Sequence, residues 1–158
     1  MNIRRANSND LQTIAKLWWD MHDFNSKYDD RYYETITKEE CIKYKFNFLK
    51  DLIDNPNHLI WVTENENEII GYVYVEIIER PPIFKYNRFA KVQEASIKRK
   101  YQQKGIFRKN FEVITKELIN QNIKLAELEI DLDNPAQMAY WKVKFYKRLI
   151  HMICWLED

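Results

Sequence analysis

Residues 97–110 read IKRKYQQKGIFRKN and hold the most informative residue of the chain, Gly105. Residues 89–97, which lead into this stretch, are rich in β-branched and aromatic residues, as in a strand. After Gly105, apolar residues recur at helical spacing. Gly105 is one of only two glycines among 158 residues. A chain so sparing of glycine should keep it where a side chain is not tolerated, so we predict a tight strand-to-helix turn here.

A turn of this kind can bind an anion, because it aims several backbone N–H groups and a helix N-terminus at one point. Basic residues surround Gly105, and no acidic residue occurs between Lys98 and Asn110. The phosphate-binding patterns GxGxxG and GxxxxGK followed by Ser or Thr are absent, which argues against NAD and ATP. The alternative interpretation is a solvated helix start with scattered lysines.

Hydrophobic periodicity and turn residues extend the prediction to the rest of the chain. The expected strands are residues 3–6, 59–63, 69–78, 89–97, 125–132 and 148–156. The first two expected helices are 11–21 and 41–52, the second preceded by a capping box of Thr37 and Glu40. A third helix has Phe107, Phe111, Ile114 and Leu118 on its apolar face, and a fourth begins at Asn134–Pro135. The order βααβββαβαβ predicts an α/β fold with a mixed, mostly antiparallel sheet. Because no linker divides the chain, residues 1–158 are expected to form a single domain.

Composition narrows the function classes. The chain has 25 basic and 24 acidic residues, a net charge of +1, so no global field favours nucleic acid or a membrane surface. No stretch approaches the ~20 apolar residues of a membrane span. Cys41 and Cys154 have no partnering pattern and suit a reducing compartment, so we expect a cytoplasmic protein. His22, His58 and His151 show no metal-ligand spacing, and no metal is expected.

Three segments together resemble the GNAT superfamily of acetyl-CoA-dependent N-acetyltransferases. The family motif (Q/R)-x-x-G-x-(G/A) reads Gln102 to Phe107 here, at the end of a strand and the start of a helix. A second family segment, a strand followed by Asn and a helix with an aromatic pair, matches Leu128 through Asn134 to Tyr140–Trp141. Gly71 matches the family glycine at the start of the third strand. The resemblance covers essentially the whole chain and implies a GNAT-like sheet with helices on both faces.

The sequence departs from the family pattern at three positions. Phe107 replaces the last Gly or Ala of the loop motif, and Phe145 stands where the family usually has Gly after its last helix. Trp141 stands where many members carry a tyrosine thought to protonate the departing thiolate, and indole cannot act as that acid.

The resemblance implies a cofactor, acetyl-CoA, bound in an open V between the fourth and fifth strands. Its pantetheine arm would bond to main-chain groups near Ala95, Ser96 and Ile97, and its diphosphate would rest on the turn. The implied cofactor-binding residues are Ala95, Ser96, Ile97, Gln102, Gln103, Lys104, Gly105, Ile106, Phe107, Asn134 and Trp141.

The reaction that the resemblance implies needs a proton acceptor, because an alkyl amine with a pKa near ~10.4 is mostly protonated at pH 7. Glu94, in the fourth strand, is our candidate base, and a solvated or salt-bridged carboxylate is the alternative. Tyr140 is the candidate acid for the departing thiolate, with core packing as its alternative role. Tyr146 is a further candidate for that acid.

The acceptor site is predicted from the acidic and aromatic residues at 28–33, before the second helix, and from the loop at 81–87. Its candidates, Tyr28, Asp29, Tyr32 and Tyr33, would suit a cationic amine by charge and cation–π contact, and a polar surface loop is the alternative. We therefore expect direct acetyl transfer to a primary amine of a small molecule or peptide in a ternary complex. The rival hypothesis is a non-catalytic sensor of coenzyme A or acyl-CoA. Nucleic-acid binding is opposed by the charge balance, and a homodimer is plausible from the family.

Overall fold

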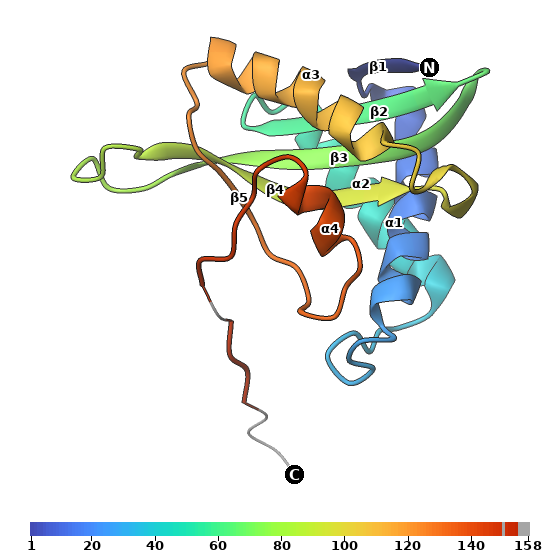
Figure 1. The fold of residues 1–158 in the computed structure, drawn as a ribbon. Helices are drawn as coiled ribbons and strands as arrows, with labels where there is room; N and C mark the ends of the chain where they lie inside the picture. The colour runs from blue at the N-terminus through green and yellow to red at the C-terminus, as the bar shows by residue number, and fades with distance from the viewer. Residues whose placement is uncertain (150, 155–158) are drawn as a thin grey trace.

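The computed structural model describes residues 1–149 and 151–154 as one five-stranded sheet with helices on both faces (Figure 1). The strands lie in the order β1-β2-β3-β4-β5, antiparallel except for the parallel pair β4/β5. Their bounds are β1 Asn2–Arg5, β2 His58–Asn65, β3 Glu68–Glu79, β4 Arg88–Ile97 and β5 Ala126–Leu128. The helices are α1 Leu11–Asn25, α2 Lys38–Leu52, α3 Ile106–Asn120 and α4 Gln137–Trp141, with 3-10 turns η1 Ser8–Asp10 and η2 Arg99–Tyr101.

The sheet separates two apolar cores. Because side chains alternate along a strand, β3 sends Val73, Val75 and Ile77 toward α3, and sends Tyr72 and Tyr74 toward α1 and α2. Figure 1 shows α3 above one face of the sheet and α1 and α2 behind the other. The predicted α/β class, mostly antiparallel sheet and helices on both faces are confirmed.

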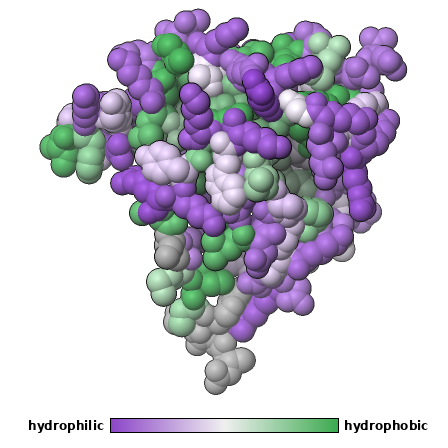
Figure 2. Space-filling view, in the orientation of Figure 1, coloured by the Kyte–Doolittle hydropathy of each residue, from purple (hydrophilic) through white to green (hydrophobic). Residues whose placement is uncertain are grey.

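Figure 2 shows that the viewed surface is largely hydrophilic. Apolar side chains gather at the tip of the β3–β4 loop, where Ile83 and Phe84 are exposed, and along the C-terminal segment, where Leu149 and Met152 are exposed. None of the described helices is long and apolar enough to cross a membrane.

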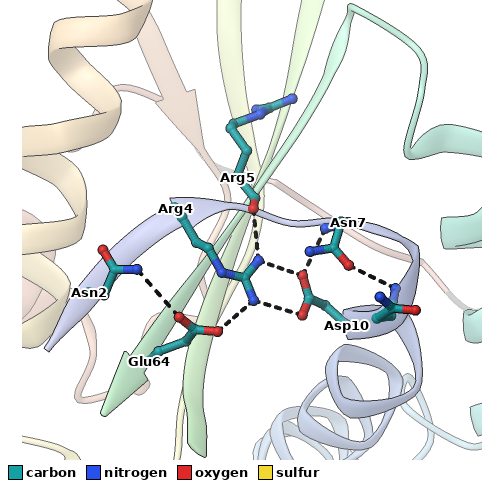
Figure 3. Close-up of polar contacts among 7 residues, drawn as sticks. Asn2, Arg4, Arg5, Asn7, Asp10 and Glu64 are labelled. Atoms are coloured by element: carbon teal, nitrogen blue, oxygen red, sulfur yellow. Dashed lines mark hydrogen bonds and ion pairs between the residues drawn. The ribbon is translucent and has the colours of Figure 1, made fainter. Parts of the chain in front are cut away.

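The N-terminal strand is held by a charged cluster around Arg4 (Figure 3). The Arg4 guanidinium donates to both carboxylate oxygens of Asp10, at 2.7 and 3.0 Å, and also to Glu64 at the end of β2. Asp10 is 5% exposed and also accepts a bond from the Asn7 main chain. Burial alone would raise the pKa of the Asp10 carboxyl, but its bonds from Arg4 and Asn7 hold it below the usual value.

The structure confirms two local predictions. Thr37 and Glu40 form the expected capping box at the start of α2, each accepting from the other's main-chain N–H. Gly71 lies at a close approach of β3 and β4, because a Cβ built on it would sit 2.7 Å from the Ser96 carbonyl oxygen. A side chain at this position would push the two strands apart.

In α3, the predicted Ile114 and Leu118 are buried and Phe111 packs on the same core, while Ile106 and Asn110 are buried as well. Three predictions of detail were wrong. The alternating strand predicted at 125–132 is a strand only over Ala126–Leu128, and α4 begins at Gln137 rather than at Asn134–Pro135. The last predicted strand, 148–156, is not formed at residues 148, 149 and 151–154, and its other positions lie outside the described residues.

Candidate functional site

The first feature of the site is a gap beside β4. β5 pairs with β4 only at Ala90, Lys91 and Val92, while on its other edge β4 stays paired with β3 as far as Ile97. In the described residues, 93–97 therefore have no partner on the β5 side. Ala95 to Ile97, which the resemblance implies as contacts of the pantetheine arm, lie within this unpaired stretch.

The second feature is the turn that follows β4. Gly105 has φ +73°, in the left-handed region that favours glycine, and Gln103 has φ +62°. The side chain of Gln102 donates to the Ile97 carbonyl at 2.9 Å and so ties the turn to the end of the strand.

The turn leaves unused donors at the start of α3. No side chain caps this helix, and its first main-chain bond runs from Lys109 N–H to Gly105 O. The amides of residues 106–108 therefore precede the hydrogen-bond ladder. A Cβ on Gly105 would meet no atom of the described chain within 4 Å, so packing does not exclude a side chain there. Free amides, a helix N-terminus and an open approach fit a phosphate group.

The basic stretch around the turn is partly neutralised by an acid distant in sequence. Glu68, at the start of β3, contacts Lys98 at 2.8 Å and Lys100 at 3.0 Å and accepts from the Tyr101 hydroxyl at 3.1 Å. Bonds from Lys98, Lys100 and Tyr101 lower the pKa of Glu68 to about 2. The sequence shows no acidic residue near the turn because Glu68 lies on the neighbouring strand, β3, and is brought close only by the pairing of β3 with β4.

The third feature is Glu94, whose carboxylate faces the α1/α2 layer. One oxygen accepts from Lys45 of α2, and the other accepts from the Tyr72 hydroxyl at 2.9 Å. Burial and the neighbouring Glu94 charge raise the pKa of Tyr72 well above its usual value, so this hydroxyl stays a donor.

A cavity of about 670 Å³ opens beside Glu94. It lies between the sheet and the two N-terminal helices, with acidic and aromatic walls. Its lining residues include Trp18, Glu34, Tyr44, Lys45, Phe48, Tyr74, Glu76, Gln93 and Glu94. Gln93 lies where the β3/β4 register shifts, and its amide donates to Glu76 at 2.6 Å. The irregular register turns both Gln93 and Glu94 toward this cavity.

The sequence interpretation missed Lys45. Its side chain is 5% exposed, and it lies one helical turn from each of the buried residues Cys41 and Leu49. Lysine is almost never buried unless it is paired. A lysine on the apolar stripe of α2 was therefore a detectable signal for a buried carboxylate elsewhere in the chain.

Two of the site residues predicted in and before α4 make hydrogen bonds or ring contacts with other residues of the protein. The Asn134 side chain accepts from Ala136 N–H at 2.9 Å and donates to Asn25 at 3.3 Å. Tyr140 packs edge-on against Phe107, with ring centroids 4.8 Å apart, and burial raises its pKa to about 12. Trp141 is 47% exposed. The roles proposed for these residues stay predictions.

The predicted acceptor residues lie in the loop between α1 and α2, and two of their side chains already bond other groups of the protein. Tyr33 donates to Asp131 at 2.8 Å, and burial together with that carboxylate raises its pKa. Asp29 accepts from the Tyr32 main chain at 2.9 Å, while the Tyr32 ring is 49% exposed. These four residues do not line the cavity, which the loop reaches through the next residue, Glu34.

Comparison with known proteins assigns the family. The model of the acetyltransferase (GNAT) family matches residues 12–145 of the chain. The chain belongs to the GNAT acetyltransferase family. Members of this family use acetyl-CoA as the acetyl donor. A search of the curated proteins finds no match.

Solved structures share the GNAT fold at low sequence identity. A tetramutant of the BH1408 protein from Bacillus halodurans has a TM-score of 0.82 at 18% identity, covering 99% of this chain and 100% of that one. A predicted acetyltransferase with acetyl-CoA, from Clostridium acetobutylicum, has a TM-score of 0.75 at 18% identity, with 98% and 96% coverage. An aminoglycoside acetyltransferase from an uncultured soil metagenomic sample, in complex with trehalose, has a TM-score of 0.67 at 16% identity, with 99% and 96% coverage. These likenesses concern the fold.

Proposed function

We propose that this GNAT protein transfers the acetyl group of acetyl-CoA to a primary amine of a small molecule or peptide, by direct attack in a complex that holds both substrates. The observation that carries the proposal is the course of β4. This strand presents Glu94 to the cavity on one face, leaves residues 93–97 unpaired on the β5 side, and ends at the turn around Gly105.

The chain's residues fit the coenzyme at two places. The main-chain groups of Gln103 to Phe107 would hold the diphosphate, because the amides of 106–108 precede the α3 hydrogen-bond ladder. Among the described residues, the edge at Ala95 to Ile97 has no strand partner on the β5 side and would hold the pantetheine arm as an added strand, with the Ile97 carbonyl already bonded by Gln102. When bound, acetyl-CoA supplies an acetyl thioester beside the cavity.

Glu94 is the proposed proton acceptor for the amine. The acceptor amine is protonated at neutral pH and must lose a proton before its lone pair can attack. Because Lys45 already bonds Glu94, an external amine must displace the Lys45 ammonium or pass its proton along that hydrogen bond. The raised pKa of Tyr140 makes it a weaker acid than a free phenol, but a thiolate, with a conjugate-acid pKa of ~8.5, departs with little assistance.

The cavity walls favour a cationic acceptor. Glu34 and Glu76 add negative charge near Glu94, and the rings of Tyr44, Phe48 and Tyr74 offer π faces. The one lysine in the wall is already paired with Glu94. A structural neighbour named as an aminoglycoside acetyltransferase adds support for an acceptor with amino groups.

The test is Glu94→Gln, with Glu79→Gln on β3 as the matched control. Glu79 is exposed at the far end of β3 and does not line the cavity. We expect Glu94→Gln to lower kcat/KM by about 10²–10⁴-fold, because a positioned base contributes on that order. The measurement is thiol release from acetyl-CoA with a panel of amines. Equal activity of the two variants would exclude Glu94 as the base.

The sensor hypothesis has one observation in its favour, which is that Lys45 already occupies the proposed base. A sensor would bind acetyl-CoA yet release no thiol with any amine of the panel. Tight coenzyme binding measured by calorimetry, together with no turnover, would select this second function over the transferase.

A further inference from the structure

Lys45 differs from the other lysines of α2 in where its side chain lies. Lys38, Lys43 and Lys50 are exposed, whereas the side chain of Lys45 is 5% exposed and lines the cavity. The protein thus contains a primary amine inside the space proposed for the acceptor.

The surroundings of Lys45 hold its amine in one place. Three rings lie around the nitrogen, with centroids at 4.8 Å for Phe48, 5.5 Å for Trp18 and 5.7 Å for Tyr74. Its hydrogen bond and ion pair go to Glu94. Rings on several sides and one carboxylate fix the nitrogen against the group that we propose as the base.

We propose that Lys45 is an internal acetyl acceptor, and that the protein acetylates its Nζ from the acetyl thioester of the bound coenzyme. This inference rests on the proposed function, because it uses the same thioester and the same base. It assigns to the chain a covalent modification site within its own cavity.

The transfer balances with the groups present. Glu94 takes one proton from the Lys45 ammonium, and the neutral amine attacks the thioester carbon. The N–C bond forms, the C–S bond breaks, and the bonding pair leaves on sulfur. The second amine proton goes to the departing thiolate. The products are N-acetyl-lysine, a protonated Glu94 and the free thiol, with no change in total charge.

Acetylation would change the site itself. N-acetyl-lysine carries no charge, so Glu94 would lose the cation that holds it in the free protein. A buried carboxylate without its partner is costly, which favours an incoming ammonium group in its place. The modified protein should therefore bind a cationic acceptor at Glu94 more readily than the unmodified protein does.

The experiment incubates the full chain with acetyl-CoA and locates added acetyl groups by peptide mass spectrometry over time. Lys45→Arg keeps the positive charge but offers no acetylatable amine, and Lys43→Arg is the exposed control on the same helix. We expect one acetyl group on Lys45 in the parent protein and in Lys43→Arg. Glu94→Gln should slow this labelling about a hundredfold, the low end of a positioned base's contribution. Melting curves verify that each variant is folded.

The outcomes separate the two proposals when external amines are assayed in parallel. If external amines are acetylated while Lys45 stays unmodified, the modification site is overturned and the transferase stands. If neither is acetylated, both are overturned. Labelling of exposed lysines at the same rate as Lys45, or labelling that Glu94→Gln leaves unchanged, would reduce the reaction to non-specific chemistry and also overturn the inference.

Discussion

Two glycines serve different physical needs in this chain. Gly71 has no room for a side chain, because a Cβ there would lie 2.7 Å from the Ser96 carbonyl oxygen. Gly105 has open space, and its requirement comes from the backbone, which has φ +73°. Gly71 is therefore needed for the packing of the sheet, and Gly105 is needed for the conformation of the turn that we propose to bind the coenzyme.

This difference predicts that alanine costs more stability at Gly71 than at Gly105. Gly71→Ala should destabilise the fold by about 1–3 kcal/mol through overpacking, which corresponds to a Tm loss of roughly 2–12 °C. Gly105→Ala adds only left-handed strain of about 1 kcal/mol. Thermal melts of both variants, alongside acetyl-CoA titrations, check this. A Gly71→Ala protein that melts like the parent would contradict the close approach of the strands.

At the residue scale, the sequence singled out Glu94 because the motif at Gln102–Phe107 follows its strand. The structure shows Glu94 as a salt-bridged carboxylate, which was the alternative interpretation, and its role as a base stays a proposal. Lys45 was missed because it is 49 positions away and only the packing of α2 on the sheet brings the two together. The predicted acceptor residues at 28–33 do not line the cavity, which the loop reaches at Glu34, and their role stays a prediction.

At the element scale, β3 is joined to the turn after β4 by Glu68. This side chain bonds Lys98, Lys100 and Tyr101, so the start of one strand clamps the end of the next. The clamp adjoins the turn around Gly105 and should help to set its position.

The Glu68 clamp predicts a defined acid sensitivity. Its pKa falls from 4.5 to about 2 in the folded protein, so its stabilisation is full above pH 4.5 and disappears as the pH falls toward 2. Glu68→Gln should therefore have a lower Tm than the parent near neutral pH, and the two melting curves should converge toward pH 2. Melts across that range test this, and a difference in Tm that does not depend on pH would contradict the clamp.

Elements with strong local signals were predicted well, and those that depend on tertiary packing were not. The capping box at Thr37 and the strand pair β2/β3 follow from local chemistry. Residues 129–132 keep the alternating pattern of a strand but do not join the sheet, since β5 leaves β4 after Leu128. In α3, Asn110 is buried and accepts a hydrogen bond from Thr63 at 2.7 Å, a polar core contact that hydrophobic periodicity does not predict.

At the scale of the whole molecule, the sheet divides the two tasks of the proposed reaction. The cavity with Glu94 and Lys45 lies on the α1/α2 side, and the turn proposed to bind the coenzyme lies at the end of β4, where α3 begins. β4 connects the two sites. In the described part of the chain, its pairing with β5 ends at Val92, so that edge of β4 is unpaired from residue 93 onward. We therefore expect both substrates to reach the reaction centre from separate openings and to be bound together.

The central claim is that the turn around Gly105 holds acetyl-CoA, and calorimetric titration of Gly105→Val tests it most directly. Asn122→Val is the matched control, because Asn122 also has a left-handed φ, +61°, beyond the other end of α3. A valine at either position imposes similar backbone strain. We predict that Gly105→Val weakens acetyl-CoA binding at least about tenfold, a loss of ~1.4 kcal/mol, while Asn122→Val leaves it unchanged. Parental affinity in Gly105→Val would contradict the account.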